Sequence, residues 1–196
     1  MRNLILKMSI SVDGFVGGPN GEIDWLFRSM GDDGREWTED LLGSAGLHAL
    51  GRKSYSEMAT FWPVSPMPMA RQMNEIPKVV FSRSGQVATP EIDEAKADKA
   101  ARESWLNPIA LGTDLVADIQ RLKAEDGKPI LAHGGAGFAT SLIAANLVDV
   151  FHLVVHPDAL GRGLSIFGGL ERPLQLKLED LKQFDTGVVV KTYRPL

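Results

Sequence analysis

The segment from Pro129 to Phe138 constrains the fold more than any other part of the chain. It begins with the apolar run Ile130 to Ala132, which is typical of a buried strand, and apolar residues then recur at helical spacing from Phe138 onward. The glycines between them, Gly134, Gly135 and Gly137, therefore occupy a strand-to-helix turn that a ligand can approach closely. Free N–H groups at the start of the helix favour an anion there, although a tight packing turn alone would also account for the glycines.

A second turn of the same kind follows the apolar run Leu47 to Leu50. It consists of a glycine, two basic residues and a hydroxyl residue: Gly51, Arg52, Lys53 and Ser54. A third apolar strand, Lys78 to Phe81, ends in Ser82 and Arg83. Ligands of open α/β sheets bind beyond the carboxyl ends of the strands, where these segments supply backbone donors and cations for phosphates. The sequence therefore predicts a site for an extended nucleotide.

The chain opens with a strand, Asn3 to Val12, which ends in the turn Ser11-Val12-Asp13-Gly14. The following segment, Phe15 to Glu22, is rich in glycine and has no periodicity, so we expect a long mobile loop at the carboxyl end of this strand.

The remaining segments alternate between strand and helix patterns. A helix is expected from about residue 35 to 44, and helical residues are expected from about residue 57 after the Gly51 turn. Thr113 is expected to cap a further helix, Trp105 to Leu111 to form a weak strand, and the chain to close with a hairpin around residues 185–187. This pattern predicts an α/β fold with a mostly parallel sheet and antiparallel edges, in a single domain spanning residues 1–196.

Composition excludes several functional classes. The net charge of −4 leaves no basic surplus for a nucleic-acid footprint, and the absence of cysteine excludes disulfides and thiolate metal sites. His152 and His156 are spaced too far apart along a strand to share a metal unaided, so no metal site is expected. No signal peptide or membrane span is recognisable, and we expect a cytoplasmic protein that binds neither membranes nor nucleic acids.

Several short motifs, taken in order, resemble those of the dihydrofolate-reductase-like family. They are Ser11-Val12-Asp13-Gly14, Gly51-Arg52-Lys53-Ser54-Tyr55, Ser82-Arg83, Gly134-Gly135-Ala136, Leu147-Val148-Asp149 and Pro157-x-x-Leu160-Gly161-x-Gly163-x-x-x-Phe167. The similarity is greatest to the reductase domain of bifunctional riboflavin-biosynthesis enzymes, and it spans nearly the whole chain.

This resemblance implies a three-layer fold with a mixed sheet of about eight strands, NADPH as hydride donor, and a homodimer. It assigns the cofactor to residues from the strand ends, namely Ser11, Gly14, Gly51, Arg52, Lys53, Ser54, Ser82, Arg83, Gly134, Gly135, Ala136 and Gly137. Asp13 would lie near the nicotinamide and substrate, and either Asp13 or a water would supply the proton. Asp13 also fits a purely structural role as a turn residue before Gly14.

Two features differ from the folate reductases. Trp25 follows Asp24 where those enzymes have a Pro-Trp pair, and the first long helix offers only Glu36, Glu39 and Asp40 as acids. The expected function is therefore NADPH-dependent reduction of a small heterocyclic or ribosylamino-pyrimidine compound, similar to the 5-amino-6-(5-phosphoribosylamino)uracil reductase reaction. A pteridine reductase and a non-catalytic NADPH-binding sensor remain as alternatives.

Overall fold

The computed structural model describes residues 1–196 and contains one eight-stranded sheet, in the spatial order β4-β3-β2-β5-β1-β6-β8-β7. The strands are β1 (Leu4–Ser11), β2 (Leu47–Gly51), β3 (Lys78–Phe81), β4 (Ile109–Leu111), β5 (Ile130–Ala132), β6 (Val150–His156), β7 (Leu176–Gln183) and β8 (Val189–Pro195). Strands β1 to β6 are parallel, and β7 and β8 form an antiparallel hairpin beside β6. The carboxyl ends of all six parallel strands therefore lie along one edge of the sheet.

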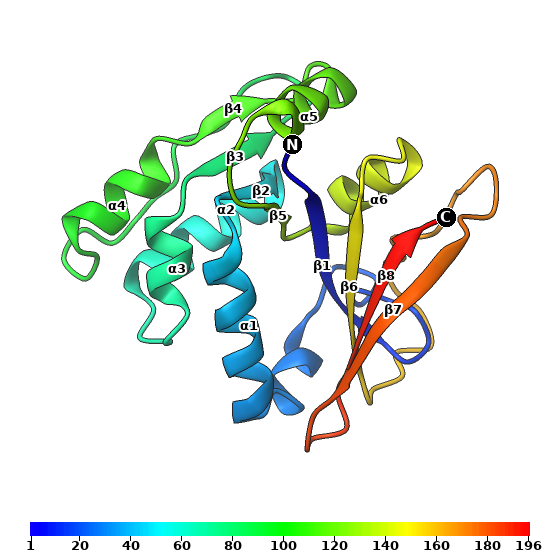
Figure 1. Ribbon diagram of the computed structural model, residues 1–196. Coiled ribbons are helices and arrows are strands. Elements are labelled where there is room, and N and C mark those ends of the chain that lie inside the picture. The colour runs from blue at the N-terminus through cyan, green and yellow to red at the C-terminus, as the bar shows by residue number, and fades with distance from the viewer.

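Helices cover both faces of the sheet and give the molecule three layers (Figure 1). The helices are α1 (Asp32–Ser44), α2 (Arg52–Phe61), α3 (Ala70–Glu75), α4 (Lys99–Leu106), α5 (Leu115–Ala124) and α6 (Ala136–Ala144), with short 3-10 helices η1 (Asp24–Arg28) and η2 (Trp62–Val64). One hydrophobic cluster packs α1 to α4 on one face of the sheet, here called the α1 face. A second cluster packs α5 and α6 on the opposite face, called the α6 face. No helix is long and apolar enough to span a lipid bilayer.

The burial of the strands follows from this layering. All five residues of β2 and all three of β5 are buried, because helices cover both of their faces. In β1 burial alternates: Leu6 and Met8 belong to the core on the α6 face, whereas Lys7 and Ser9 are only partly buried on the α1 face. The α1 face of β1 is therefore less completely covered than its other face.

Helix α1 is fixed over the sheet by contacts to the terminal hairpin. The Asp33 carboxylate accepts hydrogen bonds from the backbone N–H groups of Gly34 (2.8 Å) and Asp185 (2.9 Å). Trp37, one turn further along α1, packs against Phe184 with the ring centroids 6.2 Å apart. These contacts hold α1 over the sheet on the side of the terminal hairpin.

The predicted three-layer α/β fold, with its mostly parallel sheet and antiparallel C-terminal hairpin, is confirmed. Three local predictions were wrong. Helix α2 begins directly after Gly51 rather than near residue 57, and the fully buried Trp105 belongs to α4 rather than to a strand. The N-cap of α5 is Asp114, whose side chain accepts from Ala117 N (3.0 Å), and not Thr113.

Candidate active site

The two glycine turns meet where the chain leaves the sheet in opposite directions. Strand β2 continues into α2 on the α1 face, whereas its neighbour β5 continues into α6 on the α6 face. The N-termini of both helices therefore open at the same edge of the sheet, on either side of these two strands. Such a switch point is where open α/β sheets bind their ligands.

Both helix N-termini lack a capping side chain. Gly51 precedes α2 and Gly135 precedes α6, and neither position supplies a side-chain hydrogen bond to the first turn. Helices α4 and α5, by contrast, are capped by the side chains of Asp98 and Asp114. The first-turn N–H groups of α2 and α6 are therefore free to bind an anion, which the helix dipoles also favour.

The two turns contact each other through glycine. The Gly51 N–H donates a hydrogen bond to the Gly134 carbonyl (3.3 Å), and Gly134 has a φ of +83°, which favours glycine. A Cβ atom on Gly51 would lie 2.8 Å from Phe138 Cβ, and one on Gly135 would lie 2.9 Å from Ser54 Oγ. A side chain at either position would have to displace these neighbours, so the glycines keep a short stretch of bare backbone at the sheet edge.

The remaining predicted cofactor residues surround these turns. Gly51 pairs with Phe81 in the β2–β3 register, so the segment after β3 lies beside the start of α2. Arg52 and Arg83 are exposed there, and Arg83 has no hydrogen-bond or ion-pair partner within the protein. Lys53 is also exposed and lies 3.9 Å from the Glu57 carboxylate. This part of the edge therefore presents three cations to the solvent.

The Ser82, Ala136 and Gly137 positions complete that edge. Ser82 is buried, and its hydroxyl lies 3.0 Å from the Ser84 hydroxyl. Ala136 and Gly137 form the first turn of α6, and a Cβ on Gly137 would meet no atom within 4 Å.

Ser11 and Asp13 form a hydrogen-bonded turn. The Ser11 hydroxyl donates to an Asp13 carboxylate oxygen (2.5 Å) and accepts from Phe15 N (3.0 Å). The same carboxylate accepts from the N–H groups of Leu160 (3.1 Å) and Gly161 (2.6 Å). These bonds, that from Ser11 above all, hold the pKa of Asp13 below its usual value despite some desolvation. Asp13 is thus an ionised acceptor that ties the end of β1, before Gly14, to the loop after β6.

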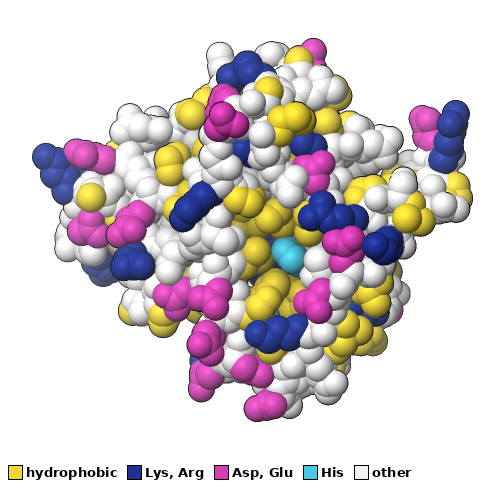
Figure 2. All heavy atoms as spheres, viewed as in Figure 1, with side chains coloured by type: hydrophobic (Ala, Val, Ile, Leu, Met, Phe, Trp, Pro, Cys, Tyr) yellow, Lys and Arg dark blue, Asp and Glu magenta, His cyan; other side chains and the backbone are white.

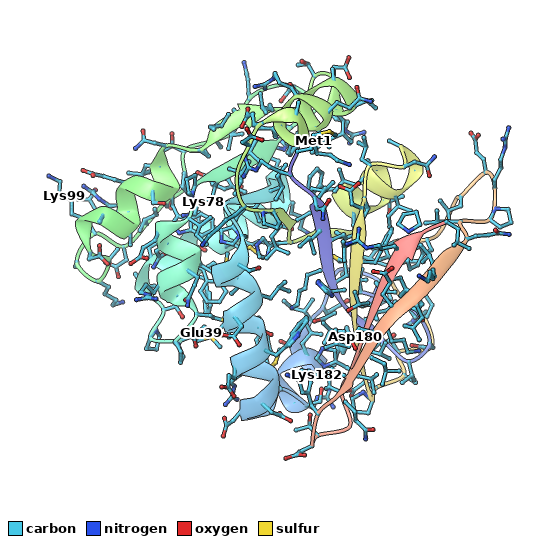
Figure 3. All side chains as sticks on the ribbon, in the orientation of Figure 1. Met1, Glu39, Lys78, Lys99, Asp180 and Lys182 are labelled. Carbon is cyan, nitrogen blue, oxygen red and sulfur yellow. The ribbon has the colours of Figure 1, made fainter.

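The α1 face has a hollow between α1 and the strands β1 and β6, with hydrophobic side chains and a histidine lining it (Figure 2). The strand register places a row of polar residues across this face. His152 of β6 pairs with Lys7 of β1 on one side and with Thr192 of β8 on the other, and Thr192 pairs with Asp180 of β7. Figure 3 shows Asp180 on β7 and Glu39 on α1, on opposite sides of this region.

Lys7 stands out in this row because it is a partly buried cation without a partner. Its ammonium group forms no hydrogen bond and no ion pair, and it is not among the fully buried unpartnered atoms, so it reaches open space. Burial lowers the pKa of Lys7 to about 8. An ammonium group in that position attracts an electron-rich atom of a ligand and can donate a proton near neutral pH.

The two histidines of β6 have separate partners. His152 Nδ1 lies 3.0 Å from Thr192 Oγ1, and His156 Nδ1 lies 2.7 Å from Ser29 Oγ. Burial lowers the pKa of His152 and lowers that of His156 to about 4. Both rings are therefore neutral at pH 7 and serve as hydrogen-bonding groups.

Sequence reasoning did not identify Lys7 as a candidate functional residue. A signal was present, because Lys7 interrupts the otherwise apolar first strand at a position that alternation directs to a covered face of the sheet. A lysine almost never occupies such a position without a partner.

The fold and the paired glycine turns define an α/β protein of dihydrofolate-reductase-like architecture. The family model of the RibD C-terminal domain matches residues 2–190, and the chain belongs to this family. It is 31% identical over 192 residues to the uncharacterized protein YyaP of Bacillus subtilis (strain 168), covering 98% of this chain and 94% of YyaP.

Solved structures show the same fold at lower identity. A diaminohydroxyphosphoribosylaminopyrimidine deaminase/5-amino-6-(5-phosphoribosylamino)uracil reductase from Thermotoga maritima aligns with a TM-score of 0.71 at 17% identity, over 100% of this chain and 57% of that one. A dihydrofolate reductase from Enterococcus faecalis, complexed with NADP(H) and RAB-propyl, aligns with a TM-score of 0.58 at 15% identity, over 98% and 96% of the two chains.

Proposed function

We propose that this protein is an NADPH-dependent reductase of a small heterocyclic substrate, a ribosylamino-pyrimidine of the 5-amino-6-(5-phosphoribosylamino)uracil type. One observation supports the proposal most strongly. Two uncapped helix N-termini converge, through closely packed glycines, at the switch point of the sheet. The relationship to reductases of the same fold agrees with it.

The residues at this edge fit NADPH. The first turns of α2 and α6 would hold the pyrophosphate, because no capping side chain occupies their N–H groups. Arg83, assisted by Arg52 and Lys53, would bind the ribose 2′-phosphate, because Arg83 has no partner within the protein and its guanidinium can donate paired hydrogen bonds to a dianion. When bound, NADPH supplies the hydride for the reduction.

The substrate would lie in the hollow on the α1 face, with Lys7 at its floor. The Lys7 ammonium would donate a hydrogen bond to an electron-rich atom of the substrate and supply the proton directly or through a water. Asp13 is the weaker candidate for the proton source, because its carboxylate is ionised and already accepts three hydrogen bonds.

A pteridine substrate has less support from this geometry. Glu36 and Asp40 of α1 are exposed, and the partly buried Glu39 accepts a hydrogen bond from Gln72 Nε2 (3.0 Å). None of these three acids is therefore both partly buried and without a partner, as an acid that binds the amidine edge of a pteridine would have to be.

The test measures NADPH binding first and single-turnover NADPH oxidation second, against pyrimidine ribosyl compounds and pteridines. We expect NADPH binding and oxidation with the pyrimidine compounds only. Lys7→Met should retain NADPH binding and lose the oxidation step, whereas Lys177→Met, at an exposed position on β7, should behave like the parent. Tight NADPH binding without turnover would indicate a nucleotide sensor, and absence of NADPH binding would refute the proposal.

A further inference from the structure

Next to Lys7, two histidines that the proposed reaction does not use form a hydrogen-bonded pair in which His48 is buried and His133 is partly buried. His48 lies on β2 with no exposed surface, and His133 directly follows β5. His48 Nδ1 lies 2.7 Å from His133 Nε2, and the ring centroids are 4.6 Å apart. The other nitrogen of His48, Nε2, lies 3.3 Å from the backbone carbonyl oxygen of Gln72.

The Gln72 carbonyl fixes the direction of every hydrogen bond in this chain of groups. A carbonyl oxygen only accepts hydrogen bonds, so His48 Nε2 must be protonated and must donate the hydrogen bond to the carbonyl oxygen of Gln72. In a neutral ring the Nδ1 of His48 is then an acceptor, and His133 Nε2 must be the donor to it. The remaining nitrogen of His133, Nδ1, is left with a lone pair.

The surroundings keep both rings neutral. Burial is the main cause that lowers the pKa of His48 to about 4 and that of His133 well below its usual value. Positive charge on Lys78 acts on His48, and positive charge on His48 and Lys7 acts on His133, and both effects reinforce the lowering of the pKa. Lys78 is visible among the helices of the α1 face (Figure 3).

The free nitrogen of His133 reaches the candidate site. His133 directly precedes Gly134 of the glycine turn, and it continues β5 next to Lys7, because Ala132 pairs with Leu6 in the preceding register position. Gln72 Oε1 and His156 Nε2 are the buried side-chain polar atoms that lack partners, so the unpartnered Nδ1 of His133 is accessible. A hydrogen-bond acceptor thus lies beside the Lys7 donor, between the glycine turn and the hollow.

Resting on the proposed function, we propose that His133 Nδ1 accepts a hydrogen bond from a ring N–H of the substrate and so selects rings that present such a donor. His48 is a positioning residue: it holds His133 in the tautomer that leaves Nδ1 unprotonated. A site built around an acceptor of fixed polarity discriminates against an analogue that lacks the matching N–H.

The first experiment reads the tautomers without any ligand. Long-range ¹H–¹⁵N NMR on the parent protein at pH 7.5 should show His48 and His133 as neutral rings protonated at Nε2. Signals are assigned with His133→Asn and His152→Asn. An Nδ1-protonated or cationic His133 would overturn the proposal.

The second experiment compares 5,6-diaminouracil with 5,6-diamino-1,3-dimethyluracil, which lacks the ring N–H groups, by calorimetry on protein saturated with NADP⁺. The parent should bind the first compound about tenfold or more tightly. His133→Asn, which places an acceptor near the position of Nδ1, should keep the preference, and His133→Phe should lose it. The control Lys177→Met, at an exposed position on β7, should retain it.

The outcomes separate the two proposals. Equal binding of both uracils by the parent, or an unchanged preference in His133→Phe, would overturn the role of His133. Absence of uracil binding by a protein that binds NADP⁺ would do the same and leave the cofactor assignment intact. Absence of NADP⁺ binding would refute the proposed function, while the NMR experiment would still decide the polarity of the histidine pair.

Discussion

Adding a single methyl group to the second glycine turn tests the cofactor site most directly. Gly135 has φ −64° and ψ −179°, which alanine adopts without strain, so Gly135→Ala should fold normally. Its new Cβ would lie 2.9 Å from Ser54 Oγ, a hydroxyl that can rotate away. The methyl group should therefore hinder the ligand more than the fold.

The expected loss follows from the contacts that the methyl group prevents. A hydrogen bond from a backbone N–H to a charged phosphate oxygen contributes about 1.5–3 kcal/mol, so losing one should weaken NADPH binding roughly 10- to 100-fold. Gly135→Val should weaken it further and abolish measurable binding. Binding is followed by titration of NADPH fluorescence, and folding by circular dichroism and urea unfolding.

A double variant separates blocked binding from local repacking. Combining Gly135→Ala with Ser54→Ala removes the contact between the new Cβ and the Ser54 hydroxyl. If the double variant binds NADPH more weakly than Ser54→Ala alone, the loss comes from the methyl group itself. Gly43→Ala, in helix α1 where a Cβ meets only Gln72 Cγ at 3.8 Å, serves as the control. Parent-like NADPH affinity in folded Gly135→Val would refute the assignment of this turn to the pyrophosphate.

Three further predictions concern cofactor choice, pH and assembly. Arg83→Ala should weaken NADPH binding roughly 10- to 100-fold and leave NADH binding nearly unchanged at equal salt; an equal loss for both would remove Arg83 from the 2′-phosphate site. Burial lowers the pKa of Lys78 to about 7, so the unfolded chain binds more protons between pH 7 and 10, and urea unfolding should show stability rising over that range. Lys78→Met should flatten this rise in the free energy of unfolding, which is at most about 5 kcal/mol for the full pKa shift from 10.5. Parallel curves of unfolding free energy against pH for the parent and the variant would contradict the prediction. We propose a homodimer through the exposed edge strand β7, where Leu178 and Leu181 are 47% and 53% exposed. Light scattering should give twice the 21.3 kDa chain mass, and Leu181→Lys should shift the measured mass toward that of the monomer. A monomeric parent protein would exclude this assembly.

The dimer prediction also shows where sequence reasoning needed correction. From the sequence, the apolar segment Val150 to Val155 and the closing hairpin together predict a sheet edge that a partner molecule covers. The structure places β6 between β1 and β8, inside the sheet, and leaves β7 at the edge. An apolar strand is buried equally well by a neighbouring strand of its own chain, and hydrophobicity alone does not distinguish the two cases.

The sequence by itself determined the local elements of the site. Strands β3 and β5 were predicted with the observed limits, because continuous apolar runs next to glycine or proline have few other structures available. The glycine turns after β2 and β5 were also readable, since glycine is required where two turns pack against each other. The resemblance of short motifs to those of the dihydrofolate-reductase-like family then assigned cofactor-binding residues to the ends of these strands.

Only the tertiary structure decided which side chains from distant segments meet. Lys7 of β1, His152 of β6 and His133, which directly follows β5, are far apart in the sequence, and they come together because the sheet order puts β1 between β5 and β6. The tautomer of His133 depends on the carbonyl of Gln72, and the lowered pKa of Asp13 depends on the Ser11 hydroxyl and on N–H groups in the loop after β6. Long-range packing supplies the partners that set the direction of each hydrogen bond and the burial of each group. A local sequence pattern therefore does not predict either.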